Sequence, residues 1–210
     1  MSSSLELAEL RLTDQLARYW VRRRVASGLA PALILTGLAM TAWGAYLPAK
    51  AGLGQHLLQQ AWERAQITGV VQRPWPWAQT WPVARLRAPA HGIDQIVLEG
   101  ADGESMAWAP GRVSGSANLR ESAGNVALAG HRDTHFAFLR DLVPGDVLVL
   151  SDIEGRRRSY RVEETLVVDQ TAVEVLGATS EATLTLITCY PFDAVRPGGP
   201  LRYVVRAVAD

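Results

Sequence analysis

Cysteine is almost absent from this chain of 210 residues, because Cys189 is the only one. A lone thiol cannot form an internal disulfide, so Cys189 is either an inert core residue or a nucleophile. The formal net charge is zero, basic residues are dispersed, and there is no glycine-rich phosphate loop or internal repeat. The sequence therefore carries no electrostatic footprint for nucleic acid.

Charge is also missing from residues 25–47. A stretch of that length can cross a bilayer core of about 30 Å as one helix. A tyrosine and a tryptophan flank each end, as interfacial anchors do. A cleaved signal peptide is the alternative, but the apolar run is long for one, residues 1–24 precede it, and Pro48 hinders cleavage. We predict an uncleaved transmembrane helix.

The distribution of basic residues predicts the orientation of this helix. The leader, residues 1–24, contains five arginines, whereas Lys50 and Arg64 are the only basic residues close behind the span. The positive-inside rule then places the leader in the cytoplasm and the chain after about residue 48 outside it.

Residues 48–82 connect the span to the rest of the chain. Residues 53–67 carry apolar side chains at helical spacing, which predicts an amphipathic stalk helix. Residues 74–82 contain three prolines and three tryptophans, so they form neither a helix nor a central strand. We expect the tryptophans to clamp this arm onto the domain surface; a groove wall or contact with the outer leaflet are the alternatives.

Short strand patterns separated by turn residues fill residues 83–210. They predict a mainly β domain, a single closed barrel of seven or eight strands with short helices. The eighth strand is expected around residues 104–109. The seven clear candidates are Ala84–Ala88, Gln95–Glu99, Asn125–Gly130, Asp146–Leu150, Ser159–Val168, Thr183–Cys189 and Leu201–Val208.

Side-chain alternation along three of these strands brings polar residues to one face. If Leu184 and Leu186 fill the barrel, Cys189 points outward. The same reasoning sends Arg202 outward from the last strand, and His131 outward at the end of an earlier one. Their side chains therefore leave the barrel wall on its outer face.

A cysteine, a histidine and an arginine are the components of acyl transfer: a thiolate nucleophile, a proton shuttle and a fixed cation for the oxyanion. Cys189, His131 and Arg202 are therefore the candidate residues for these three roles. Arg196, in a glycine-containing loop, is the alternative for the oxyanion role, but a strand holds a guanidinium more firmly.

Metal binding is a second interpretation of the histidine segment. His131 and His135 have the i, i+4 spacing of two ligands on a helix, and Asp133 lies between them. The preceding strand ends at Gly130, however, and no third ligand is evident. We predict no metal requirement and no cofactor.

Three segments resemble the signature motifs of the sortases: Leu-Ala-Gly-His-Arg-Asp at 128–133, Thr-Leu-Ile-Thr-Cys at 185–189 and Leu-Arg-Tyr-Val-Val at 201–205. The resemblance covers about residues 83–210. Tyr-Pro-Phe-Asp after the thiol and the Trp-Pro arm make the chain most similar to the class GN sortases of Gram-negative bacteria. The resemblance implies an eight-stranded barrel and a membrane-anchored cysteine transpeptidase of the bacterial inner membrane, with its catalytic domain in the periplasm.

Residue by residue, the resemblance implies that Cys189 attacks the threonine carbonyl of an LPxTG-like sorting signal and forms a thioester. His131 would protonate the leaving amine and later deprotonate the incoming one, and Arg202 would bind the oxyanion or the signal. The substrate would be a protein with such a C-terminal signal. The acceptor amine could belong to peptidoglycan or another protein, and water would give hydrolysis alone.

Two other classes remain open. An L,D-transpeptidase would contain a Ser-x-Gly-Cys-x-Arg run, from which Ile-Thr-Cys-Tyr-Pro departs. A non-enzymatic, membrane-tethered binding barrel would leave Cys189 inert.

Overall fold

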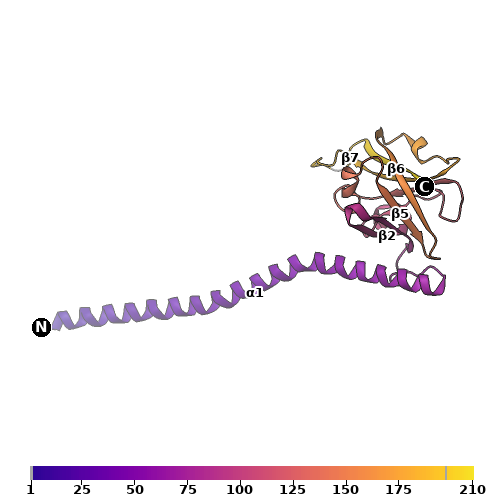
Figure 1. The fold of residues 1–210 in the computed structure, drawn as a ribbon. Coiled ribbons are helices and arrows are strands. Elements are labelled where there is room, and N and C mark those ends of the chain that lie inside the picture. The colour runs from indigo at the N-terminus through magenta and orange to yellow at the C-terminus, as the bar shows by residue number, and fades with distance from the viewer. Residues whose placement is uncertain (1, 197) are drawn as a thin grey trace. The chain divides into compact units, whose positions relative to one another are not determined.

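The computed structural model describes residues 2–196 and 198–210, without the side chains of residues 2–17 and 19–30. The chain forms two compact units, Met1–Ala51 and Gly52–Asp210 (Figure 1). The second unit contains all eight strands of the described chain. The side chains of the predicted cytoplasmic leader, apart from Arg18, lie outside the described residues.

Helix α1 (Ser2–Thr68) is continuous, although leader, span and stalk were predicted as separate pieces. Its part from Pro31 onward is long and apolar enough to cross a membrane, with a mean hydropathy of 1.4 over 18 residues, none of them buried. The hydroxyls of Thr36 and Thr41 donate to carbonyls one turn earlier, at 2.9 and 2.8 Å. These hydroxyls are hydrogen-bonded within the helix, as polar groups in a bilayer core must be because no water reaches them there. The limits 25–47 of the span stay a prediction.

The C-terminal part of α1, around Leu58 and Trp62, packs against the barrel. Leu58 and Trp62 are almost completely buried, and they contact Ile96 and Leu98. Gly54 lies so close to the ring of Trp108 that a Cβ there would be 2.3 Å from it. The predicted stalk is therefore a helix docked along the domain, because its apolar face finds a partner on the barrel wall.

The tryptophan-rich arm also lies on the domain, as predicted for Trp75. The Trp75 ring packs edge-on against Trp108, with centroids 5.0 Å apart. Thr80 donates to the carbonyl of Glu99 at 2.6 Å and ties the end of the arm to the barrel. Trp77 takes no part in this clamp, since it is 76% exposed.

The strands close into a barrel in the order β1-β2-β3-β4-β7-β8-β6-β5, which confirms the predicted fold class. The expected position of the eighth strand was wrong: residues 104–109 lie partly in the short helix α2 (Gly103–Met106). The missing strand, β3, has only two residues, too few to show any alternation. The strands are β1 (Pro82–Ala88), β2 (Ile93–Glu99), β3 (Gly111–Arg112), β4 (Gly124–Ala129), β5 (Val147–Asp152), β6 (Arg157–Asp169), β7 (Ala182–Tyr190) and β8 (Leu201–Ala209).

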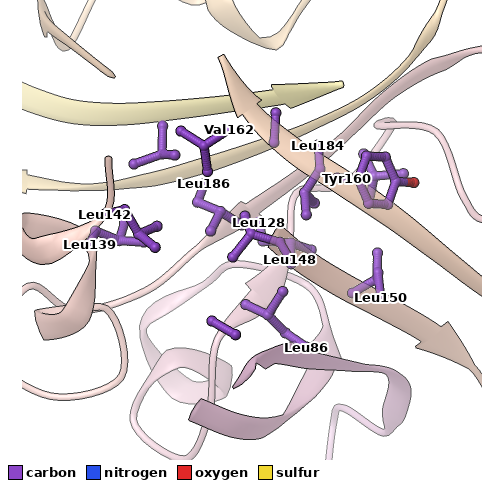
Figure 2. Close-up of a cluster of buried hydrophobic side chains, with 14 of the residues drawn as sticks. Leu86, Leu128, Leu139, Leu142, Leu148, Leu150, Tyr160, Val162, Leu184 and Leu186 are labelled. Atoms are coloured by element: carbon purple, nitrogen blue, oxygen red, sulfur yellow. The ribbon is translucent and has the colours of Figure 1, made fainter. Parts of the chain in front are cut away.

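Leucines from several strands meet inside the barrel, as Figure 2 shows. Leu128, Leu184 and Leu186 are fully buried in this core, so the predicted alternation of β4 and β7 is confirmed. Burial of this apolar surface is the main favourable term for the fold. Three 3-10 helices connect the strands: η1 (Pro89–His91), η2 (Ala137–Asp141) and η3 (Val173–Leu176).

Candidate active site

Cys189 lies at the penultimate position of β7, on the face opposite the leucine core. Its Cα is paired with that of Arg202 across the antiparallel β7–β8 ladder. The thiol belongs to a half-buried, unbridged cysteine. The structure thus places the predicted nucleophile and the predicted cation directly opposite each other.

His131 follows β4, which runs parallel to β7. The register pairs Ala129 with Ile187, and continuing it by two residues brings the His131 backbone beside that of Cys189. Two hydrogen bonds hold this continuation: Gly130 N–H donates to Ile187 O at 3.2 Å, and the buried Thr188 hydroxyl donates to Gly130 O at 2.7 Å. The residue before the histidine is therefore fastened to the residue before the cysteine.

A tight turn follows His131, closed by a hydrogen bond from Phe136 N–H to His131 O at 2.9 Å. Glycine is required before it, because a Cβ on Gly130 would lie 2.9 Å from the Phe136 ring. The turn is not helical, so His131 and His135 lack the shared helix face that metal ligation would need. Burial, and then the neighbouring His131, lower the pKa of His135.

Metal-ligating side chains do not gather within the described residues: no group of three or more histidine, cysteine or acidic side chains is placed to hold an ion there. What the described residues bring together at this site are groups for thiol and imidazole chemistry.

The guanidinium of Arg202 is fixed by three acceptors. Its Nη1 donates to Gly199 O at 2.7 Å and to Leu201 O at 2.9 Å, and its Nη2 donates to Gln170 Oε1 at 3.0 Å. Arg196, the alternative cation, is an exposed residue of the β7–β8 connection. The strand residue, and not the loop residue, is the one opposite Cys189.

Arg132 links the histidine turn to the β7–β8 connection. Its Nη2 donates to the carbonyls of Ala194 at 2.7 Å and Arg196 at 3.3 Å. Three aromatic rings pack together where β7 ends and β8 begins, with centroids 5.1 to 6.2 Å apart. They belong to Tyr190 of β7, Phe192 of the connection and Tyr203 of β8. These contacts order the segment that joins the cysteine strand to the arginine strand.

A groove with a volume of about 180 Å³ lies on the outer face beside this site. Outward-facing Ala129, Ile187 and Val204 line it from the strands, together with Arg202. The β6–β7 connection, with Val173, Val175 and Leu176 of η3, lines its other side. The groove is mostly apolar, and Arg202 is the one predicted site residue that lines it, since Cys189 and His131 are not among its lining residues.

A larger cavity of about 530 Å³ lies elsewhere in the barrel. Core-facing Leu128 and Leu150 line it, together with Trp81 of the arm, and it includes none of the three predicted site residues. Among its charged lining residues, Glu99 and Arg112 pair with each other at 2.7 Å. The chemistry of the cysteine face is therefore separate from this larger cavity.

Sequence reasoning missed the residues that hold the site in place: Thr188, Arg132 and Gln170. The two threonines of the Thr-Leu-Ile-Thr-Cys segment were the available signal, since buried hydroxyls in a strand need partners. The partners of Arg132 and Gln170 lie 62 and 32 residues away, so no local pattern marks them.

Comparison with known proteins identifies a family for the barrel. A family model described as Sortase domain matches residues 86–210. Sortase D of Bacillus subtilis (strain 168) is 31% identical over 121 residues, which cover 57% of this chain and 60% of that protein. Sortase A of Listeria monocytogenes serovar 1/2a is 30% identical over 115 residues, covering 51% and 49%. The chain thus matches about half to three fifths of the length of these curated relatives.

Solved structures show the same fold. Listeria monocytogenes sortase A aligns with a TM-score of 0.55 and 26% identity, over 61% of this chain and 87% of that one. A Clostridium perfringens Sortase D5 transpeptidase aligns with a TM-score of 0.58 and 20% identity, over 75% and 96%.

Proposed function

The chain belongs to the sortase family, and on that basis we propose that it is a membrane-anchored cysteine transpeptidase. The substrate is a protein with an LPxTG-like C-terminal sorting signal, cleaved between threonine and glycine. The acyl part is transferred to an amine of peptidoglycan or of another protein.

One observation supports this proposal most strongly: Cys189 and Arg202 are paired across two strands, and the His131 turn is fastened to the same strand as the cysteine. Acyl transfer needs a nucleophile, a proton carrier and a cation held in fixed relative positions. Strands and short hydrogen-bonded turns provide such positions better than free loops do.

The reaction follows from these roles. The Cys189 thiolate attacks the threonine carbonyl carbon, and the negative charge that forms on oxygen is stabilised by Arg202. The tetrahedral intermediate collapses as the bond to glycine breaks, and His131 donates a proton to the departing amine. The incoming amine then gives a proton to His131, attacks the thioester and releases the thiolate.

The apolar groove beside Arg202 suits the leucine and proline of the signal. A segment in that groove would place its C-terminal threonine near Cys189, because the outward residues of β7 lead from Ile187 to the thiol. The exposed apolar surface of α1 supports a single membrane span. The five arginines before that span support an orientation with the N-terminus in the cytoplasm and the barrel in the periplasm. Membership of class GN stays a prediction.

The test uses the full chain in detergent micelles with a fluorogenic LPxTG-type peptide and an added amine. We expect cleavage between threonine and glycine and an amine adduct, both absent in Cys189→Ala. His131→Ala and Arg202→Ala should each reduce kcat/KM by at least about 100-fold, the scale of losing a general acid or an oxyanion donor. Arg206→Ala is the matched control, because Arg206 lies on the same face of β8, four residues further from Cys189.

The possible outcomes separate the alternatives. Cleavage to the free acid alone, with no adduct, would indicate a sorting-signal endopeptidase. No cleavage, together with a Cys189 that resists thiol-reactive probes, would favour a non-enzymatic binding barrel. Since Cys189 is the only cysteine, any labelling reports on this position.

A further inference from the structure

One wall of the groove is a connection between strands, and its position decides the width of the groove. Strand residues Ala129, Ile187 and Val204 line the other side. The β6–β7 connection contributes Val173 and Val175 of η3. A short 3-10 helix has little stability by itself, so something else must hold this wall against the barrel.

Asn125 lies beneath that wall, on the outer face of β4, and is only 3% exposed. Its side-chain Nδ2 donates to Val175 O at 3.1 Å and to Gly177 O at 3.3 Å. Both acceptors are backbone carbonyls of the wall segment. One amide group thereby ties two points of the connection to strand β4.

Thr185 fixes which way the Asn125 amide points. The Thr185 hydroxyl, on a side chain that is 1% exposed, donates to Asn125 Oδ1 at 2.8 Å. The amide oxygen of Asn125 therefore accepts its hydrogen bond from β7, and the amide nitrogen donates to the wall. This network joins β4, β7 and the β6–β7 connection through buried polar atoms, which are costly to leave unpaired.

We propose that Asn125, oriented by Thr185, is a positioning residue for the peptide groove. It holds residues 173–177 as a wall that exists before the peptide binds, and the apolar side chains of the sorting signal pack against that wall. A preformed groove saves the free energy of ordering this connection at the moment of binding. The inference rests on the function proposed above, because it assigns the groove to the signal peptide.

Four variants of the full chain test this role. Asn125→Ala removes both donors, and Thr185→Val removes the hydroxyl that orients them while keeping the shape of the side chain. Thr185→Ser restores the hydroxyl. Thr183→Val is the matched control, because Thr183 lies on the same face of the same strand, is equally buried, and bonds Glu181 O instead of the wall.

Two measurements are made on each variant: KM and kcat for the fluorogenic peptide, and amide hydrogen exchange of residues 170–181 against the barrel strands. For Asn125→Ala we expect KM to rise about tenfold with kcat changed less than about twofold, since lost ground-state binding acts on KM. The amides of the wall should exchange faster while those of β4 and β7 stay protected. Thr185→Val should show a smaller change of the same kind, and the other two variants should match the parent.

Several results would overturn the inference. One is an unchanged KM and unchanged exchange in Asn125→Ala or Thr185→Val; another is a loss in Thr183→Val as large as in Thr185→Val. If Asn125→Ala does not fold, the comparison of Thr185→Val with Thr185→Ser still decides. If the parent cleaves no sorting peptide, the proposed function fails, but the exchange data still decide whether Asn125 holds the wall.

Discussion

The docking of α1 on the barrel predicts different effects of the same substitution at two nearby glycines. An alanine at Gly52, which has no atom within 4 Å of its added Cβ, should stabilise the protein. Alanine is favoured over glycine in a helix by about 1 kcal/mol. Alanine at Gly54 favours the helix by the same free energy, but its Cβ would lie 2.3 and 2.6 Å from two ring atoms of Trp108.

The size of the difference follows from that contact. Overpacking in a close-packed site costs about 1–3 kcal/mol. Since the propensity gain is common to both variants, the free energy of unfolding of Gly54→Ala should lie below that of Gly52→Ala by this amount. Trp108 cannot move aside freely, because its ring also contacts Trp75 and its carbonyl accepts a hydrogen bond from Gln55.

Thermal unfolding of the full chain in detergent micelles, followed by near-ultraviolet circular dichroism, measures the difference. At about 2–4 °C per kcal/mol, the Tm of Gly54→Ala should lie about 5 °C below that of Gly52→Ala. An equal rise of Tm in both variants would refute the reasoning, because it would mean that the helix does not pack at Gly54.

Two further predictions concern the barrel itself. Thr188→Val removes the hydrogen bond that fastens Gly130 to β7. We expect it to lower kcat/KM for the peptide about tenfold, because His131 is then misplaced, and we expect Thr188→Ser to keep the activity. A valine variant as active as the parent would contradict this role. A hydrogen bond from Val143 N–H, and then one from His91, lower the pKa of Asp146. Stability from a carboxylate with a lowered pKa is present above its unfolded pKa and lost as the pH falls through the folded one. Asp146→Asn should therefore be less stable than the parent at pH 7, and urea unfolding should find the difference shrinking below about pH 4; a difference independent of pH would count against it.

The barrel could be predicted from the sequence wherever alternation was long enough to see. Leu184 and Leu186 identified the inner face of β7, and the opposite face of Cys189 followed from period two. β3 could not be found, because a strand of two residues shows no period, and its pairing with β2 and β4 is defined only in the folded barrel. The docking of Leu58 and Trp62 was missed for a related reason: an amphipathic pattern shows that a helix has an apolar face, but not what covers it.

The sequence was enough to predict which residues form the candidate site, but not which strand pairings and hydrogen bonds hold them in place. Cys189, His131 and Arg202 were identified by their chemistry and by the motifs around them. Pairing of Cys189 with Arg202 needed the antiparallel register, which only the folded barrel defines. Asn125 is an ordinary polar residue in a strand pattern, and its importance depends on carbonyls 50 and 52 residues away.

The closed ring of strands limits how this protein can recognise an extended chain. Every strand of the described barrel has a hydrogen-bonded neighbour on each side. The pairing is short only at β3, which meets β2 and β4 at two positions each, whereas β8 is paired along its length with β7 and β6. An incoming peptide at the cysteine face therefore finds no open edge of β8 on which to continue the ladder by β-augmentation, which reads backbone more than side chains. Recognition must come from the side chains and loops of the outer face, so selectivity can change by substitutions there while the barrel stays the same.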